Sequence, residues 1–367
     1  MNTILIGGLF AILFAILQSL GIWRHGLFIG FGITTALLAI HYNFGNDYWA
    51  YYDWYEDAMT TPLSNSIYDF LEISRDPGWD LLNLLFSKLF GTNGFFIMVS
   101  FLSLIEGLCY YMFIKKFVPK QWYWFAMALY VLNNHFFILT FSMMRQALVM
   151  ALLLPCFTLI KQKKIITTLI IILLLSTIHN SVLLCLPLVV IPFIPISNKK
   201  LIAIVLIVLW LVLLLATNIL DSILKQIASF TYSFGRYIDI YSKDSNMTYG
   251  IGYLLRLIPF IYMIYGLFTN RFEDKDIPFM LIWSLTIILI PFGTIIPIFA
   301  RLLFYFELVE LAVLPKLYSS IHFKPIRYAL IISSLILIIY SLHLSFYTPS
   351  SVYYEPYLEF NTIFDII

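Results

Sequence analysis

Long apolar runs recur along the whole chain, and they restrict it to folds that a lipid bilayer surrounds. A helix crosses the hydrocarbon core of a membrane with about 20 apolar residues. Runs that approach this requirement cover residues 4–22, 27–42, 94–114, 122–139, 143–160, 165–179, 182–196, 201–217, 251–268, 278–296, 299–315 and 326–346. We therefore predict an all-α, polytopic integral membrane protein with about twelve transmembrane helices in a single transmembrane domain, residues 1–367.

The composition excludes a water-soluble enzyme. Hydrophobic residues make up 61% of the chain and charged residues only 11%, whereas a soluble domain carries about 25% charged residues. A net charge of +2 gives no bulk attraction for nucleic acid. The three cysteines lie in apolar runs without zinc-ligand spacing, and no nucleotide-binding glycine motif occurs. We expect no metal, no cofactor and no cytosolic nucleotide substrate.

Two of the predicted spans are short. The second of them, residues 182–196, is interrupted by Pro187, Pro192 and Pro195. We expect 165–179 and 182–196 to be re-entrant or broken helices, which a membrane tolerates only where other protein covers the freed backbone groups. Residues 81–90 are predicted as an amphipathic helix at the membrane interface.

The distribution of charge orients the predicted helices. Of the 22 Lys and Arg residues, 14 lie in alternate loops around residues 24, 115–120, 161–164, 199–200, 271–275 and 316–327. The opposite side receives 14 of the 20 Asp and Glu residues, in segments 43–93, 218–250 and 347–367. The positive-inside rule places the basic loops in the cytoplasm. It thus predicts extracytoplasmic loops at about 43–93 and 218–250, with both termini extracytoplasmic.

The first extracytoplasmic loop combines carboxylates with aromatic side chains. Residues 43–80 contain eight Asp and Glu residues and one Arg, with Tyr and Trp between the acids. Carboxylates accept hydrogen bonds from the hydroxyl groups of sugars, and flat aromatic rings stack on the apolar faces of sugar rings. The composition of this loop therefore favours sugar binding. Tyr and Trp are also common at membrane interfaces, and a purely structural origin of the pattern stays open.

Three arginines lie inside or at the ends of apolar spans, namely Arg145, Arg256 and Arg301. An intramembrane Arg is costly and by default indicates a functional site. The predicted topology places all three near the outer ends of their helices, on the same side as Arg236. Guanidinium groups match phosphate oxygens in two-point contacts, so a shared anion site is predicted. Snorkelling to lipid headgroups or pairing with local acids is the alternative.

Two residues on the outer side are candidate bases. His179 falls at the turn between the two short spans, and Asp47 lies in the first outer loop. Either side chain can accept a proton from a substrate hydroxyl, although His179 can equally cap a broken helix. Glu307 and Glu310, three residues apart on one helix face, fit a proton path or a packing contact with Tyr or Lys, and we expect the contact.

Four short motifs follow one another along the chain. They are Gly45-Asn46-Asp47-Tyr48-x-x-Tyr51, Asp76-Pro77-Gly78-Trp79-x-x-Leu82, Met144-Arg145-Gln146-Ala147 and Ile178-His179-x-Ser181. This order and spacing resembles the EpsG branch of the Wzy-type polysaccharide polymerases, whose pattern runs G-x-D-x-x-x-Y, E-P-G-[FY], R-Q and H-x-S before later arginines. Asp76 replaces the usual Glu, and His41 stands near the place where an Arg often precedes the first motif.

The resemblance implies a GT-C-like helical membrane glycosyltransferase that needs neither nucleotide nor metal. Such enzymes act at the outer face of the bacterial cytoplasmic (inner) membrane. They transfer a growing glycan from undecaprenyl diphosphate onto the next lipid-linked oligosaccharide unit. The product is a capsule, an exopolysaccharide or the O-antigen of lipopolysaccharide, and a flippase and a chain-length regulator are the expected partners.

The resemblance also implies roles for individual residues. Arg145, Arg256 and Arg301 bind and neutralise the leaving diphosphate, and Asp47 or His179 accepts the proton of the acceptor hydroxyl. The expected substrate-binding residues are Arg256, Arg236, Tyr48, Tyr51, Asp76 and Gln146.

Three other functions use similar features. A flippase for lipid-linked glycan would use the same outer arginines, but it should also carry an inward-facing counterpart and paired repeats. A membrane O-acyltransferase would need a cytoplasmic donor site and an intramembrane His. An O-antigen ligase usually carries one large periplasmic loop, whereas the outer material here is divided between 43–93 and 218–250.

Overall fold

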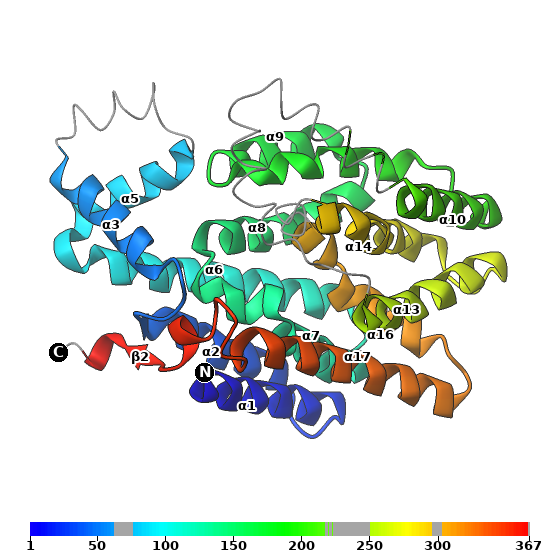
Figure 1. Cartoon of the computed structure of the whole chain (residues 1–367), viewed down its shortest axis with the longest axis horizontal. Helices are drawn as coiled ribbons and strands as arrows, with labels where there is room; N and C mark the ends of the chain where they lie inside the picture. The colour runs from blue at the N-terminus through cyan, green and yellow to red at the C-terminus, as the bar shows by residue number, and fades with distance from the viewer. Residues whose placement is uncertain (62–75, 217–218, 220–221, 223–249, 296–302, 366–367) are drawn as a thin grey trace. The chain divides into compact units, whose positions relative to one another are not determined.

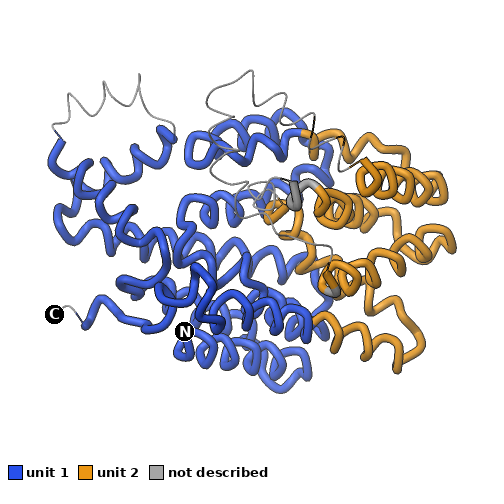
Figure 2. Tube along the Cα trace, viewed as in Figure 1, with its two compact units in different colours: residues 1–186, 335–367 blue, residues 187–334 orange. Residues whose placement is uncertain are grey.

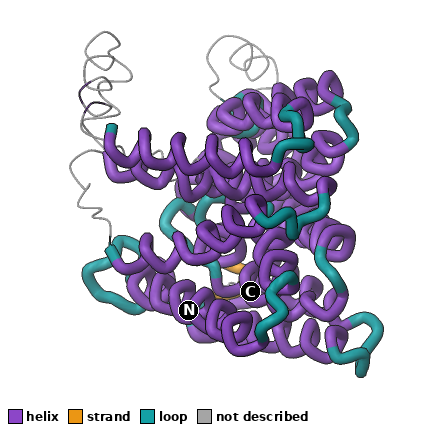
Figure 3. The backbone as a smooth tube through the Cα atoms, turned by 90° about the vertical axis from the view of Figure 1, so that its right-hand side faces the viewer, coloured by secondary structure: helices purple, strands orange, loops and turns teal. Residues whose placement is uncertain are grey.

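The computed structural model describes residues 1–61, 76–216, 219, 222, 250–295 and 303–365. Arg236, Arg301 and nearly all of the predicted loop 218–250 lie outside these residues. The described chain is helical almost throughout (Figure 3). Its sheet consists of two short antiparallel strands, β1 (His41–Tyr42) and β2 (Asn361–Thr362).

The chain forms two compact units (Figure 2). Unit 1 comprises residues 1–186 and 335–367, and unit 2 comprises residues 187–334. Two helices cross the boundaries between them, the 3-10 helix η5 (Asn180–Phe193) and α17 (Lys324–Phe346). The expected single transmembrane domain stays a prediction.

Unit 1 holds most of the sequence motifs. Its helices are α1 (Asn2–Ser19), α2 (Gly26–Ile40), α3 (Tyr48–Thr60), α5 (Pro77–Phe90), α6 (Gly94–Phe117), α7 (Tyr123–Leu132), α8 (Met144–Lys161) and α9 (Ile165–Ser176) (Figure 1). α2 packs between α1 and α6, α6 also contacts α8, and α8 contacts α9. α1 turns the small buried residues Ala11 and Ala15 inward, which allows helix axes to approach closely in a membrane protein.

Unit 2 contains α10 (Lys199–Leu215), α13 (Ile251–Phe268), α14 (Ile277–Ile295), the helical residues 303–307 and α16 (Glu310–Ser319). α14 contacts α10, α13 and α16. The acids of the predicted cytoplasmic loop have local partners, since Asp274 pairs with Lys199 at 2.7 Å and Asp276 pairs with Lys316. These acids neutralise basic side chains on their own side.

Apolar side chains on the outside of the helices support a membrane location. α10 exposes one continuous apolar face, formed by Leu201, Ile204, Val205, Val208, Leu211 and Val212. This spacing matches one side of a helix, and an apolar stripe of that length is unusual on a soluble protein. Lipid tails are the environment that suits such a face.

The helices vary in their ability to span a bilayer. Among the described residues, four helices are long and apolar enough to cross a membrane, or five if one bent pair counts as a single span. Several other predicted spans correspond to shorter apolar helices, including α2, α9 and η5. Each of the predicted stretches contains helix, but the count of twelve crossings and the GT-C-like arrangement stay predictions.

Two predicted spans depart from a straight α-helix. The stretch 122–139 bends by 57°, because the chain leaves α7 at Asn133, whose side chain accepts the backbone N–H of His135 at 3.1 Å. A π-helix, η3 (Asn134–Ile138), and a 3-10 turn, η4 (Leu139–Phe141), follow. The stretch 182–196 is mostly the 3-10 helix η5, in which Pro187 and Pro192 remove backbone donors that an α-helix needs.

The first segment predicted to be extracytoplasmic contains more helix than the stretch 81–90 expected from the sequence. α3 begins directly after Asp47, and α5 begins at Pro77, four residues before the predicted start. Proline suits the first helical position because no intrahelical partner is lost there. α3 packs on α5 (Figure 1). The location of α5 at a membrane interface stays a prediction.

In unit 1, hydrogen bonds join helix ends and terminal residues that the predicted topology assigns to the same side of the membrane. On the predicted outer side, the N-terminal ammonium group donates to the carbonyl oxygen of Leu358 at 2.9 Å. On the predicted cytoplasmic side, Lys116 donates to Thr158 Oγ1 at 3.2 Å, and the N–H of Trp124 donates to Ser19 Oγ at 3.1 Å. These contacts are consistent with the predicted grouping of the helix ends into two sides. Which side faces the cytoplasm stays a prediction.

Candidate functional site

The four sequence motifs come together in unit 1. The second motif reaches the fourth through Gly78, whose backbone N–H donates to the carbonyl oxygen of Thr177 at 2.7 Å. A Cβ atom on residue 78 would lie 2.3 Å from Thr177 Oγ1 and 3.1 Å from Ile178 Cγ1. Glycine is therefore required here for close approach, and it brings the start of α5 against the turn that carries His179.

The first motif reaches the third through the loop before α3. Gly45 has a φ of 104°, a left-handed conformation that glycine adopts without strain. Its position lies against the backbone of Phe141, since a Cβ atom there would stand 3.0 Å from the Phe141 carbonyl oxygen. The N–H of Asp47 then donates to Ser142 Oγ at 3.1 Å. The candidate base is thus held beside the segment that leads into Arg145.

Arg145 joins three of the motifs. Its Nη1 pairs with Asp76 Oδ2, and its guanidinium carbon lies 4.5 Å from the ring centre of Trp54 and 5.8 Å from that of Tyr51. Cations are attracted to the faces of aromatic rings. The carboxylate and the two rings therefore fix the guanidinium in one orientation at the beginning of α8.

The side chains of Arg145 and Asp76 are largely but not completely buried. Their side chains keep 21% and 14% of their surface exposed. Arg145 Nε is buried and has no hydrogen-bond partner among the described residues. A guanidinium offers five N–H donors in a planar fork, so the pair with Asp76 leaves Arg145 able to bind a further acceptor.

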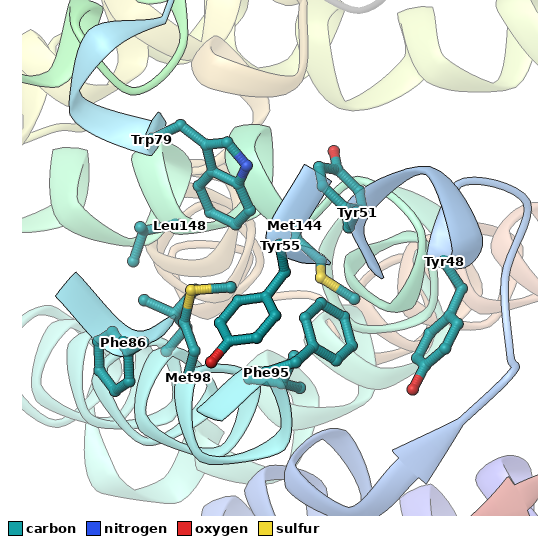
Figure 4. Packing of buried hydrophobic residues seen from close by; sticks show 11 residues of the cluster. Tyr48, Tyr51, Tyr55, Trp79, Phe86, Phe95, Met98, Met144 and Leu148 are labelled. Atoms are coloured by element: carbon teal, nitrogen blue, oxygen red, sulfur yellow. The ribbon is translucent and has the colours of Figure 1, made fainter. Parts of the chain in front are cut away.

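A buried, mainly aromatic cluster joins the helices that meet at this ion pair, and Figure 4 shows its side chains. Its members come from α3, α5, α6 and α8, and they are Tyr48, Tyr51, Tyr55, Trp79, Phe86, Phe95, Met98, Val99, Leu102, Met144 and Leu148. Trp79 is fully buried, and its ring lies 5.4 Å from that of Tyr51. The cluster includes Met144, the residue before Arg145, so it packs together the helices that carry Arg145 and its aromatic neighbours.

The structure divides the aromatic residues of α3 into two groups. Tyr48 and Tyr51, which we expected to bind substrate, are 0% and 5% exposed and belong to the buried cluster. Trp49 and Trp54 are 45% and 39% exposed. A sugar ring can reach the two tryptophans more easily than the two tyrosines. The nearby tryptophans were expected from the sequence to hold sugars together with Tyr48 and Tyr51, and their role in sugar binding stays a prediction.

Tyr51 lies between two opposite charges. Burial raises the pKa of Tyr51, the positive charge of Arg145 opposes this shift, and the negative charge of Asp47 adds to it. The net direction is upward, so the Tyr51 hydroxyl stays neutral at physiological pH. Asp47 and Arg145 thus both act electrostatically on the Tyr51 hydroxyl.

His179 and Gln146 occupy less exposed places. His179 is half-buried and follows the end of α9, where its backbone N–H donates to the carbonyl oxygen of Leu175 at 3.1 Å. Gln146 is 4% exposed and lies in α8 next to Arg145. His179 belongs to the turn that Gly78 contacts, and Gln146 directly follows Arg145, but neither presents as much surface as Asp47, which is exposed.

Unit 2 contains a second arginine–carboxylate pair. Arg256 Nη1 donates to Glu307 Oε1 at 2.9 Å, with 32% of the arginine side chain and 2% of the glutamate side chain exposed. Glu310 accepts a hydrogen bond from Trp283 Nε1 at 3.2 Å. The partner of Glu307 is therefore an arginine, and that of Glu310 a tryptophan, where we expected Tyr or Lys.

The arginines of the predicted shared anion site do not all lie in one unit of the described structure. Arg145 belongs to unit 1 and Arg256 to unit 2, while Arg236 and Arg301 lie outside the described residues. The joint action of these arginines stays a prediction. Within the described residues, no three His, Cys, Asp or Glu side chains are grouped as metal ligands.

Comparison with known proteins assigns the chain to a family. No curated protein and no solved structure matches it. A sequence profile of the EpsG family matches residues 26–361, a range that includes all four motifs, all of unit 2 and most of unit 1. The chain is a member of the EpsG family.

Proposed function

We propose that this protein is a polysaccharide polymerase that transfers a growing glycan between lipid-linked repeat units at the outer face of a bacterial cytoplasmic membrane. Membership of the EpsG family supports a polymerase in general, and the apolar helices support a membrane location. The observation that carries the proposal is the convergence of the four motifs in unit 1, where Arg145 joins three of them and Gly78 reaches the fourth.

The proposed reaction needs a charged group at the leaving diphosphate. The bond between the anomeric carbon of the donor sugar and its diphosphate breaks, and the lipid diphosphate leaves with the electron pair. The acceptor hydroxyl oxygen forms the new glycosidic bond and loses its proton to a base. Arg145 stabilises the negative charge that develops on the diphosphate, because its orientation is fixed before the reaction begins.

Asp76 has a supporting role in this proposal. It neutralises Arg145 in the absence of substrate and orients the guanidinium fork. A diphosphate has more acceptor oxygens than a carboxylate, and arginine binds such groups through two parallel hydrogen bonds. Substrate therefore engages the donors that Asp76 leaves available, and Asp76 continues to hold the opposite edge of the guanidinium.

Asp47 is the base that the geometry favours, with His179 as the other candidate. Asp47 is exposed, and its backbone N–H donates to Ser142 Oγ, so the residue is held in place at a surface that a hydroxyl group can reach. Trp49 and Trp54 offer exposed rings for sugars. Arg256, Arg236 and Arg301 supply further contacts to the diphosphate of donor or acceptor, and Gln146 supports α8 beside Arg145.

Surface glycan analysis tests this proposal. Deletion of the gene from its host should leave single repeat units attached to surface lipid, because delivery to the outer face is intact and only elongation is lost. Loss of a flippase would leave no repeat units at the surface. Loss of a ligase would leave long glycan on the lipid carrier. Either of the last two patterns would overturn the polymerase assignment.

A further inference from the structure

The C-terminal segment lies across the loop that carries Asp47. Its strand β2 pairs with β1, with Thr362 opposite His41 and Asn361 opposite Tyr42. β1 directly precedes the first motif. The end of the chain is therefore joined by backbone hydrogen bonds to the entrance of the candidate catalytic loop, although the two are more than 300 residues apart.

Two further hydrogen bonds reach the motif itself. The backbone N–H of Gly45 donates to the carbonyl oxygen of Pro356 at 3.0 Å. Asn46 Nδ2 donates to the carbonyl oxygen of Val352 at 3.1 Å. Gly45 and Asn46, the two residues that precede Asp47, are thus both hydrogen-bonded to the C-terminal segment. The loop cannot shift without breaking these hydrogen bonds.

Aromatic packing anchors the segment. Tyr357 is fully buried, and its ring lies 4.8 Å from Phe44 and 4.8 Å from Phe346 of α17. Phe360 lies 5.2 Å from Phe44 and 6.2 Å from Phe141. Segments that serve only as solvated tails do not bury aromatic rings in this way.

The opposite side of the loop is fixed as well. Ser142 Oγ accepts the N–H of Asp47 at 3.1 Å, and Phe141 packs edge-on against Phe44 at 5.1 Å. The loop is thus enclosed between the segment before α8 and the C-terminal segment. Removal of either side would free the backbone on which the Asp47 carboxylate stands.

We propose that residues 347–362, here called the C-terminal strap, position Asp47 for proton transfer and remain closed during turnover. Tyr357 is the positioning residue that anchors the strap, and it acts on the reaction only through Asp47. This inference rests on the proposed function, since it assigns a role to residues around the same catalytic loop. It predicts that the strap belongs to the active site although the strap carries none of the four motifs.

A double-mutant cycle tests the positioning role. Tyr357→Ala should lower kcat for chain elongation about tenfold or more, because a displacement of about 1 Å can cost as much as 100-fold. The KM for the lipid-linked unit should change little, since Arg145 is untouched. Tyr357→Phe should keep the wild-type rate, because the buried ring provides the anchor.

The cycle is completed with Asp47→Asn. If the strap acts through Asp47, then adding Tyr357→Ala to Asp47→Asn should lower the remaining rate less than about twofold, since coupled residues are not additive. An equal loss in both backgrounds would overturn the proposal and leave Tyr357 with a general structural role.

A reversible cross-link tests whether the strap stays closed. Tyr42→Cys with Asn361→Cys places two thiols on opposed strand residues, where Cα atoms lie roughly 4.5–5.5 Å apart, within the range of a disulfide. The native cysteines are buried, and the single Tyr42→Cys variant serves as control. The oxidised double variant should form the cross-link and keep the elongation rate of its reduced form within about twofold.

The outcomes separate the strap from the polymerase assignment. Failure of the disulfide to form would overturn the strap geometry, whatever the reaction is. A rate lost on oxidation and restored by reduction would show a lid that must open, and would overturn the closed strap. If wild-type protein elongates no glycan while the cross-link forms readily, the proposed function fails and the strap geometry stands.

Discussion

The backbone N–H of Gly78 donates to the carbonyl oxygen of Thr177 at 2.7 Å, and this bond joins two motifs from distant parts of the chain. It fixes the start of α5, where Asp76 meets Arg145, against the turn that carries His179. The candidate site thus depends on a contact that leaves no room for a side chain at residue 78.

Gly78→Ala should separate these two motifs. The added Cβ atom would lie 2.3 Å from Thr177 Oγ1, and overpacking of this kind typically costs about 1–3 kcal/mol. We expect a lower melting temperature in detergent and a loss of chain elongation. Gly32→Ala is the matched control, because no atom lies within 4 Å of its added Cβ. Equal melting temperatures for the two variants would contradict the required close approach.

Arg145→Lys should lose most of the elongation activity while the protein stays folded. A lysine is a point charge and cannot keep both the pair with Asp76 and the stacking on Trp54 in the geometry of a guanidinium fork. We expect a loss of about tenfold or more in kcat/KM, measured with a defined lipid-linked repeat unit.

Arg271→Lys is the control for that substitution. Arg271 also stacks on an aromatic ring, 4.8 Å from the centre of Tyr265, but it lies in a predicted cytoplasmic loop. Its replacement should leave elongation unchanged. Similar losses in both variants would show that the effect comes from weakened packing, and the role of Arg145 at the diphosphate would fall.

The sequence predicts the helical class and the motif set more fully than the site geometry. Apolar runs mark helices because a bilayer demands them, and α1, α2, α6 and α8 begin within two residues of the predicted spans. The bend after α7 could not be foreseen in the same way. It depends on a side-chain hydrogen bond from Asn133, and no proline marks it.

The partners of the charged residues were also beyond sequence reasoning. An isolated Arg in an apolar run indicates a functional site, but the pairing of Arg145 with Asp76 and of Arg256 with Glu307 is set by tertiary contacts between distant helices. The C-terminal strap gave no signal either, since its contacts with Gly45 and Asn46 use mainly backbone carbonyl groups.

The Arg256–Glu307 pair allows stability and activity to be separated. Arg256→Met alone should destabilise the protein by roughly 3–5 kcal/mol, because it removes the cationic group that pairs with a buried carboxylate. Arg256→Met with Glu307→Leu should recover the melting temperature, since apolar replacement of a buried pair is often neutral. Elongation should stay low in the double variant if Arg256 contacts substrate. Full recovery of elongation would limit the pair to a structural role.

Cysteine labelling tests the predicted orientation in the membrane. The two variants are Asp53→Cys and Lys164→Cys. Residue 53 is exposed on α3, and residue 164 is exposed after the end of α8. A membrane-impermeant maleimide should label residue 53 in intact cells and residue 164 only after the membrane is permeabilised, because the positive-inside rule places basic loops in the cytoplasm. The reverse pattern would place the four motifs on the cytoplasmic side and remove the basis for an outward-facing site.

Reconstitution with defined lipid-linked repeat units tests the central claim most directly. Purified protein in vesicles, with chelator and without nucleotide, should convert single units into a ladder of longer glycans. Arg145→Ala protein with an unchanged melting temperature should leave the units unjoined. A ladder of normal length from that variant, or no ladder from the wild-type protein, would contradict the proposal that the motifs around Arg145 form the active site of a polymerase.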